Sequence, residues 1–377
     1  MKAKALIVLL LVSFLMNPIS AVTGEDALYA LDWSFDNNAV YEAFSGGGSA
    51  VETPSLTYDN NPASLSSKSF GFSTPYASAT VFNTKSAVSF LNNETWAENI
   101  GTGYTPLYEL TGGVEGRFKY AGLDLRVRKA LYAYGKTEEN VGRESAVMAL
   151  TSFRAGLALG FKHFWAWNFS LSAGLYTGLE LETRSKVYNT GYIADIRQAG
   201  LLETLMKRDM EYISRFRVPL SAGVILNIPA GFALGVRGSN RSLLVSDSYT
   251  VKGTEEYKTK ALAFGDGALK TLKLENDWTL DAGLSWATLR LFKRDHYITL
   301  FADVVDILGI AQGEPFTDHI RAGLEYQYRS AYIRGSWQMG GFSCGIGADI
   351  FLVHFDIAYS WFETESDRLS LTARVGL

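Results

Sequence analysis

Hydrophobic and polar side chains alternate along most of the chain from about residue 107 to the C-terminus. The segment 123–128, Leu-Asp-Leu-Arg-Val-Arg, places three apolar side chains on one face and three charged side chains on the other. The segment 169–182 continues the same alternation over a longer stretch. Because successive side chains of a strand point to opposite faces, this pattern predicts β-strands with one apolar and one polar face.

The number and length of these segments distinguish a membrane barrel from a soluble sheet protein. Soluble strands are typically about 5–6 residues long, whereas a strand that crosses a bilayer needs about 9–11. The predicted lengths therefore favour a transmembrane barrel over a soluble sandwich or propeller. The predicted strands cover 110–120, 123–128, 149–162, 169–182, 214–228, 231–242, 277–287, 296–307, 319–329, 330–339, 343–350, 352–361 and 367–377.

The connections between the strands are of two kinds. Some are very short, as at residues 121–122 and 329–330, and others are long and polar, as at 135–147, 184–211 and 244–274. Short periplasmic turns that alternate with long external loops are typical of bacterial outer-membrane barrels.

The N-terminus predicts export. In residues 1–21, Lys2 and Lys4 precede an apolar run over 5–16, an Asn-Pro pair ends the run, and an acceptable cleavage site follows near Ala21. The apolar run is shorter than the roughly 20 residues that a spanning helix needs, so it is interpreted as a cleaved signal peptide. With the strand pattern, it places the mature protein in the bacterial outer membrane.

Residues 22–66 do not alternate and are rich in Gly, Ser, Asn and Asp. A segment tethered inside the barrel would have this composition, and so would a disordered periplasmic leader. Composition alone leaves both possibilities open.

Composition and charge exclude several other classes. The formal net charge of -4 does not suggest a nucleic-acid partner. The mean hydropathy of +0.02 is too low for a helical membrane bundle, but it fits strands with one apolar face. The single cysteine, Cys344, excludes an intramolecular disulfide framework and a multi-cysteine metal site. The four histidines show no metal-ligand spacing, and no phosphate loop or dinucleotide motif is present, so no metal and no cofactor are expected.

Two N-terminal stretches resemble the signature of the FadL/OmpP1 superfamily of long-chain fatty-acid transporters. The glycine-rich stretch 46–51 includes Gly47, and a second stretch contains Asn61, Pro62 and Ala63. The sequence departs from the family pattern by having serine where a glycine follows the alanine. Segments 300–306, 320–326, 345–349 and 355–359 resemble the late strands of the same barrels.

The resemblance implies an all-β fold, a transmembrane antiparallel β-barrel of about 14 strands over 67–377 with an N-terminal plug, or hatch, over 22–66. It implies that Gly47, Asn61, Pro62 and Ala63 form the turn motif of the hatch. It also implies uptake of hydrophobic compounds through a lateral opening. Two departures are that the chain does not end in an aromatic residue and that its loops are shorter than in the best-known transporters.

Three features are candidates for ligand handling. Arg126 and Arg154 lie on the polar register, where they would either hold a ligand carboxylate or brace the barrel through ion pairs. Pro219 lies inside a predicted strand and marks either a simple bulge or a side window, since proline cannot donate to the strand ladder. Near-helical spacing of apolar residues in the loop 186–211 predicts an amphipathic helix. This helix would either pack on the barrel mouth or capture cargo. The residues that would capture cargo are Ile196, Leu202, Leu205 and Met206.

The function expected from these features is transport of hydrophobic small molecules such as long-chain fatty acids. The alternative is a non-transport outer-membrane barrel, such as an adhesin or a structural or secretion-associated relative. A membrane-embedded hydrolase is a third possibility, but the Gly-x-Ser-x-Gly match at 341–345 precedes a strand instead of a helix, so no enzyme activity is expected. The expected partners are outer-membrane lipid, the hydrophobic cargo and, during insertion, the barrel-assembly machinery, and the expected state is a monomer.

Overall fold

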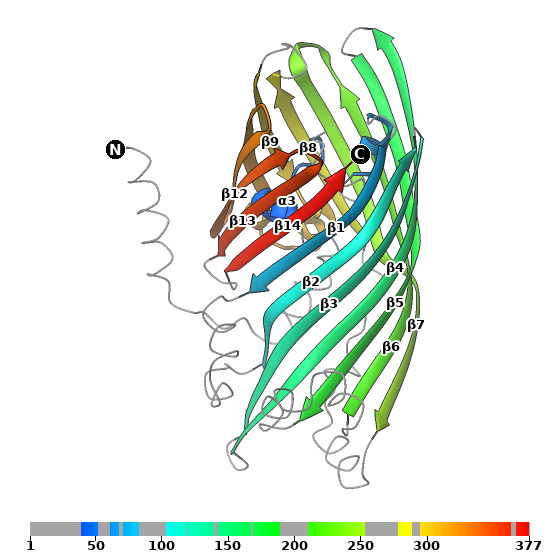
Figure 1. Ribbon diagram of the computed structural model, residues 1–377, viewed down its shortest axis with the longest axis vertical. Helices are drawn as coiled ribbons and strands as arrows, with labels where there is room; N and C mark the ends of the chain where they lie inside the picture. Colours follow the sequence, from blue (N-terminus) through cyan, green and yellow to red (C-terminus); the bar gives the residue numbers. More distant parts are fainter. Residues whose placement is uncertain are drawn as a thin grey trace, which may run out of the picture.

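Fourteen antiparallel strands close into one barrel, as the resemblance implies, and the thirteen alternating segments correspond to β2–β14 (Figure 1). Each strand pairs with its neighbours in sequence, and β1 pairs with β14 to close the barrel. A computed structural model describes residues 39–51, 61–67, 71–82, 103–118, 120–138, 142–166, 169–188, 210–252, 278–288, 295–362 and 367–376.

The strands are β1(Gly71–Phe82), β2(Gly103–Phe118), β3(Ala121–Glu138), β4(Gly142–Ala166), β5(Phe169–Tyr188), β6(Met210–Asn227), β7(Phe232–Lys252), β8(Trp278–Ala287), β9(His296–Val304), β10(Ile320–Tyr328), β11(Ala331–Gln338), β12(Gly341–Ile350), β13(Val353–Phe362) and β14(Arg368–Gly376). The helices are α3(Ala39–Ala43), η1(Pro62–Ser67), η3(Pro229–Gly231), α9(Ile307–Ala311) and η5(Phe316–His319). No helix among the described residues is long and apolar enough to cross a membrane.

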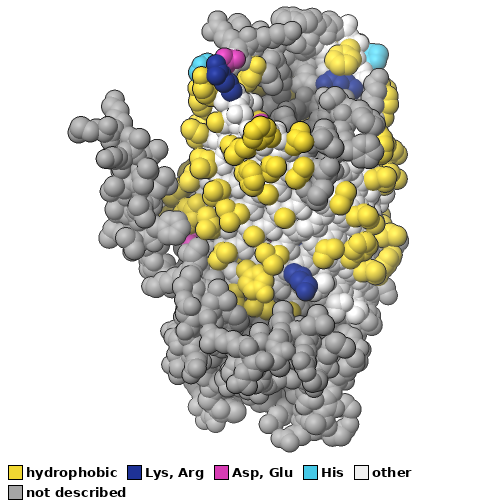
Figure 2. Space-filling view, viewed as in Figure 1, with side chains coloured by type: hydrophobic (Ala, Val, Ile, Leu, Met, Phe, Trp, Pro, Cys, Tyr) yellow, Lys and Arg dark blue, Asp and Glu magenta, His cyan; other side chains and the backbone are white. Residues whose placement is uncertain are grey.

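The apolar face of the strands points outward and the polar face points inward. Leu125 on β3 is 53% exposed, whereas its neighbours Asp124 and Arg126 are buried inside the barrel. Figure 2 shows hydrophobic side chains spread over the outer surface, with few charged groups between them. Exposed apolar side chains in this arrangement contact lipid, so the strand pattern has the polarity of a transmembrane barrel.

The barrel has one tall side and one short side. Strands β2 to β7 are 16 to 25 residues long, whereas β8 to β14 are 8 to 10 residues long. The tall strands continue into residues that were predicted as loops, at 135–138, 142–147, 184–188 and 244–252. Those loop predictions were wrong because charged residues suggested loops, while the backbones of neighbouring tall strands continue to pair, as Lys186 does with Glu211.

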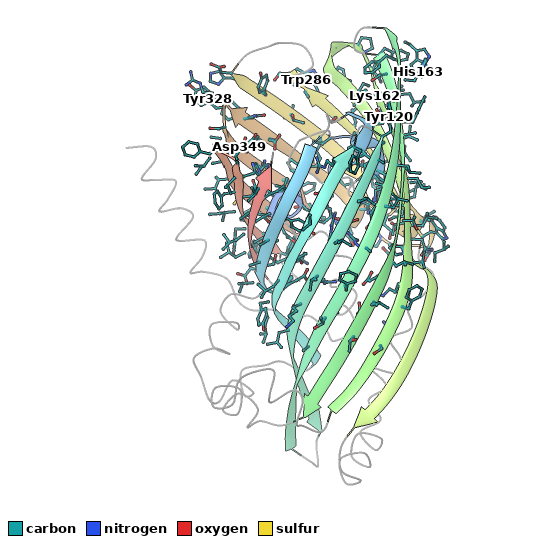
Figure 3. The ribbon with its side chains drawn as sticks, turned by 45° about the vertical axis from the view of Figure 1, so that its right-hand side comes forward. Tyr120, Lys162, His163, Trp286, Tyr328 and Asp349 are labelled. Carbon is teal, nitrogen blue, oxygen red and sulfur yellow. The ribbon has the colours of Figure 1, made fainter. Side chains whose placement is uncertain are left out.

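The longest connections, such as 253–277 and 305–319, lie at one end of the barrel, where short ones such as 339–340 also occur, and the other end has mostly short turns. Tyr120, Lys162, His163, Trp286, Tyr328 and Asp349 mark the end with short turns (Figure 3). Three turns at this end place a residue other than glycine in the left-handed region, at Ala230, Arg329 and Phe351. Tight hairpin turns require such conformations, and the short-turn end is the one expected in the periplasm.

Strand β1 was not predicted, although it closes the barrel between β14 and β2. Its register shifts between Ser73 and Tyr76 with respect to both neighbours. Pro75 lies in this shift, and because proline has no backbone N–H, it cannot take part in a regular ladder.

Residues 39–51 and 61–67, named here the interior segment, lie inside the barrel. Helix α3 packs against β11 to β14, and η1 packs against β4 to β6, on another part of the inner surface. The aromatic rings of Phe44 and Phe301 meet edge to face, with centroids 5.0 Å apart, in a cluster with Val40 and Val51. The barrel is thus plugged by its own chain, and the predicted boundary of the hatch at residues 22–66 extends beyond the described residues.

Candidate functional site

Glycines on the inner face of the barrel make room for the interior segment. A Cβ atom on Gly174 of β5 would overlap the carbonyl group of Pro62, and one on Gly235 of β7 would overlap the carbonyl oxygen of Ser49. These glycines belong to two cross-strand pairs, in which Gly174 faces Gly223 and Gly235 faces Gly283. The inner wall therefore lets the backbone of the plug approach the backbone of the strands.

We expect Gly174→Ala to lower the free energy of unfolding by about 1–3 kcal/mol, the usual cost of overpacking. The methyl group would overlap backbone atoms of Pro62, which cannot move as freely as a side chain. Gly335→Ala is the matched control, because the nearest atom to its added methyl group is 3.8 Å away. Urea-unfolding midpoints in detergent or lipid vesicles measure both effects. Equal losses for the two variants would contradict close packing of the plug at Gly174.

Backbone amides of the interior segment are held by polar side chains of the wall. Asp303 on β9 accepts hydrogen bonds from the backbone N–H groups of Gly48, at 2.5 Å, and Ser49, at 2.7 Å. On β8, the Ser285 hydroxyl donates to the carbonyl oxygen of Ala50 at 2.8 Å. These bonds fix the glycine-rich stretch against the short side of the barrel.

A group of small hydroxyl side chains receives the first part of the segment. The Ser45 hydroxyl lies 2.8 Å from that of Ser336 and 3.0 Å from that of Ser343. The backbone N–H of Ala39 donates to the Thr372 hydroxyl at 2.8 Å. Ser343 is the serine of the hydrolase-like motif, and it lies within strand β12, where its hydroxyl also donates to Ser360.

The inner face of the tall side carries buried ion pairs. Arg126 lies 2.8 Å from Asp124, and Arg154 lies 3.5 Å from the same carboxylate. The Tyr176 hydroxyl donates to Asp124 at 3.1 Å, and Arg154 stacks over the Tyr176 ring. The structure thus brings together the two arginines that the sequence singled out, and it shows that they share one acidic partner.

A second buried ion network joins side chains of three strands on the short side, β10, β11 and β13. Arg334 on β11 donates to Glu325 on β10 at 2.7 Å and also to Asp356 on β13. The intervening strand β12 has Gly347 at this level, where a Cβ atom would overlap the Asp356 carboxylate and lie 3.0 Å from the Arg334 guanidinium. The glycine therefore lets the guanidinium reach over one strand to the next.

An apolar groove of about 850 Å³ lies on the outer surface across β13, β14, β1, β2 and β3. Strand pairing aligns Gly112, Ala77 and Ala373 as its floor, and places Val127 and Phe355 at the two ends of that row. The β1–β14 ladder is continuous along the groove, so the groove does not pierce the wall.

Two residues of the predicted hatch motif, Gly47 and Asn61, lie in the interior segment. Gly47 lies against the wall, where a Cβ atom would be 2.9 Å from the Phe301 ring. The Asn61 side chain donates to the carbonyl of Ser49 at 2.7 Å and accepts from the N–H of Ala63 at 3.0 Å, so it joins both parts of the interior segment.

Pro219 lies away from the groove, and the candidate residues of the loop 186–211 lie outside the described residues. Pro219 is buried in β6 at a register shift against β7, and the groove lies on other strands. The predicted signal peptide also lies outside the described residues, as do the loop residues Ile196, Leu202, Leu205 and Met206.

No family model and no curated protein matches this chain. Among solved structures, the toluene transporter TbuX of Ralstonia pickettii has a TM-score of 0.50 at 12% identity, covering 90% of this chain and 97% of TbuX. The toluene transporter TodX of Pseudomonas putida has a TM-score of 0.45 at 13% identity, with 96% and 99% covered. A FadL homologue of Pseudomonas aeruginosa has a TM-score of 0.42 at 12% identity, with 90% and 98% covered. The likeness to TbuX confirms the predicted resemblance at the level of the fold alone.

Proposed function

We propose that this protein carries hydrophobic small molecules across the outer membrane, with long-chain fatty acids as the expected class. The proposal rests on the apolar groove on the lipid-facing wall of a barrel whose interior is occupied by its own chain. A general porin would instead conduct through a water-filled lumen. TbuX, which shares the fold, is described as a toluene transporter.

A route for the cargo follows from the positions of these features. Arg126 and Arg154 would receive a fatty-acid carboxylate, which would compete with Asp124 for them. The cargo would then leave the lumen beside the register shift between Ser73 and Tyr76 and pass along the groove into the bilayer. The predicted helix in the loop 186–211 would capture the cargo before it enters.

We expect Ala77→Phe to lower oleate uptake by roughly tenfold, equivalent to about 1.4 kcal/mol, because the ring would occupy the floor of the groove. Uptake of labelled oleate is measured in host cells that lack their own fatty-acid transporter. Their outer leaflet limits spontaneous entry of hydrophobic molecules. Ala302→Phe on β9 is the matched control, since it adds the same ring at an exposed position away from the groove and should leave uptake unchanged.

The alternative, a non-transport barrel, also predicts an occupied lumen, so uptake decides between the two. If the alternative is right, cells that display the wild-type protein on their surface will take up oleate no faster than cells that lack it. That result would reject transport of fatty acids and favour an adhesive, structural or secretion-associated role. A variant lacking residues 22–60 tests the plug separately, because its removal should open a path for polar molecules as well.

A further inference from the structure

Three side chains of metal-ligating type meet in the connection between β9 and β10. Asp306 lies near the start of this connection, Glu314 near its middle and His319 at its end. One carboxylate oxygen of each acid and one ring nitrogen of His319 all lie within 4.8 Å of one another. The connection is at the long-loop end of the barrel, so the group lies outside the membrane-spanning strands.

The orientation of His319 points to a ligand for its second nitrogen. Its Nδ1 lies 2.9 Å from the carbonyl oxygen of Val305, and because a carbonyl only accepts, the proton is on Nδ1. The ring is buried, and among the described residues its Nε2 has no hydrogen-bond partner. Nε2 faces a carboxylate oxygen of Glu314 at 3.0 Å. A histidine whose Nδ1–H is fixed by a backbone carbonyl presents Nε2 in the way that metal-bound histidines do.

The two carboxylates converge on a position that lacks a side chain. A Cβ atom on Gly309 of α9 would lie 2.8 Å from an oxygen of Asp306 and 2.8 Å from an oxygen of Glu314. The Asp306 side chain also accepts the Gly309 N–H, so one of its oxygens is held in place while the other faces the group. Two carboxylate oxygens so close to each other repel unless a cation or a proton lies between them.

No lysine or arginine supplies that charge within the part of the chain that the structure describes, where the His319 ring is the basic group that faces Glu314. Neither Asp306 nor Glu314 forms an ion pair with a lysine or arginine there. A further acid lies close by, since the backbone N–H of Asp306 donates to the Asp281 carboxylate at 2.8 Å, and Arg237 pairs with Asp281 at 3.8 Å. The positive charge of Arg237 is therefore directed at Asp281 and not at Asp306 or Glu314.

We propose that Asp306, Glu314 and His319 bind one divalent metal ion of the zinc class, with water as the remaining ligand. Imidazole nitrogen with two carboxylate oxygens suits Zn²⁺, whereas Ca²⁺ and Mg²⁺ are bound through oxygen ligands. The half-exposed Glu314 carboxylate can close the short remaining distance to the ion. The ion would join the two ends of this connection, immediately after the strand whose Asp303 holds the plug.

The test is zinc binding by the full-length barrel, purified without a histidine tag and stripped of metal, in competition with a chromophoric chelator. We expect one Zn²⁺ per chain. Both Glu314→Gln and His319→Ala should weaken binding by at least about 100-fold, because each removes a direct ligand. Calcium in excess should not displace the zinc.

Two controls separate ligand loss from misfolding and from stray histidine binding. His296→Ala removes an exposed ring at the short-turn end, which stacks on Tyr328, and should keep wild-type affinity. Glu314→Gln changes a half-exposed side chain and should leave the unfolding midpoint of the metal-free barrel unchanged. Wild-type affinity in both Glu314→Gln and His319→Ala would overturn the proposal, as would a wild-type protein that binds no zinc.

Discussion

Asp303→Ala is expected to release the plug from the short side of the barrel and to raise ion conductance across a planar bilayer. Asp303 is buried and accepts two backbone N–H groups of the interior segment. Its removal takes the acceptor from both amides, at a cost of about 1–3 kcal/mol for each buried group. A plug that loses this much attachment opens more often, so conductance and polar-solute entry should rise while the strands stay paired.

Two further variants make this prediction specific. Asp303→Asn keeps one acceptor oxygen and should have an intermediate effect. Ser285→Ala removes a single hydrogen bond to the same stretch, that to the Ala50 carbonyl, and should cost only about 1 kcal/mol. Identical conductance and thermal stability in wild type and Asp303→Ala would show that the plug is retained by other contacts.

Arg334→Met is expected to lower the free energy of unfolding by about 3–5 kcal/mol, because it leaves uncompensated charge in a buried site. The guanidinium lies between Glu325 and Asp356, and all three side chains are buried. Methionine is similar in length and fills the space, so the expected decrease in the free energy of unfolding comes mainly from the unpaired charges and not from lost packing. Urea unfolding in lipid vesicles, followed by circular dichroism, measures the change.

The same site offers a rescue experiment and a control. Arg334→Met combined with Glu325→Gln and Asp356→Asn should recover much of the lost stability, because no ionised group then remains buried. Arg329→Met breaks an exposed pair with Asp295 and should cost no more than about 1 kcal/mol. If the triple variant were less stable than Arg334→Met alone, Glu325 and Asp356 would stabilise the barrel in some way other than by neutralising the charge of Arg334.

Period-two alternation was enough to predict the barrel and the facing of its side chains. Leu125 and Arg126 face opposite sides as predicted, because lipid and lumen impose opposite polarity on adjacent residues. Strand ends beyond the membrane could not be predicted in the same way. The strand residues 184–188 and 244–252 lie within stretches that were predicted as loops. Outside the bilayer, a polar or charged sequence does not show whether the backbone pairs with a neighbouring strand.

The parts of the site that depend on strand order were also beyond the sequence. Gly347 gains its meaning only when β12 lies between Arg334 and Asp356. The inward glycines, such as Gly235, were a signal that could have been used, because glycine is unfavourable in a strand unless another backbone approaches closely. Histidine spacing alone does not reveal the group at His319, since its other members are carboxylates in a connection that folds back on itself.

The unequal strand lengths have a consequence for the surrounding lipid. With a rise of about 3.3 Å per residue and a tilt near 40°, an eight-residue strand such as β11 spans only about 20 Å of membrane. The apolar band of such barrels is about 25 Å tall, so we expect the bilayer beside the shortest strands to thin. The groove borders this region through β13 and β14. A hydrophobic molecule that leaves the barrel there would enter the bilayer next to its thinned part.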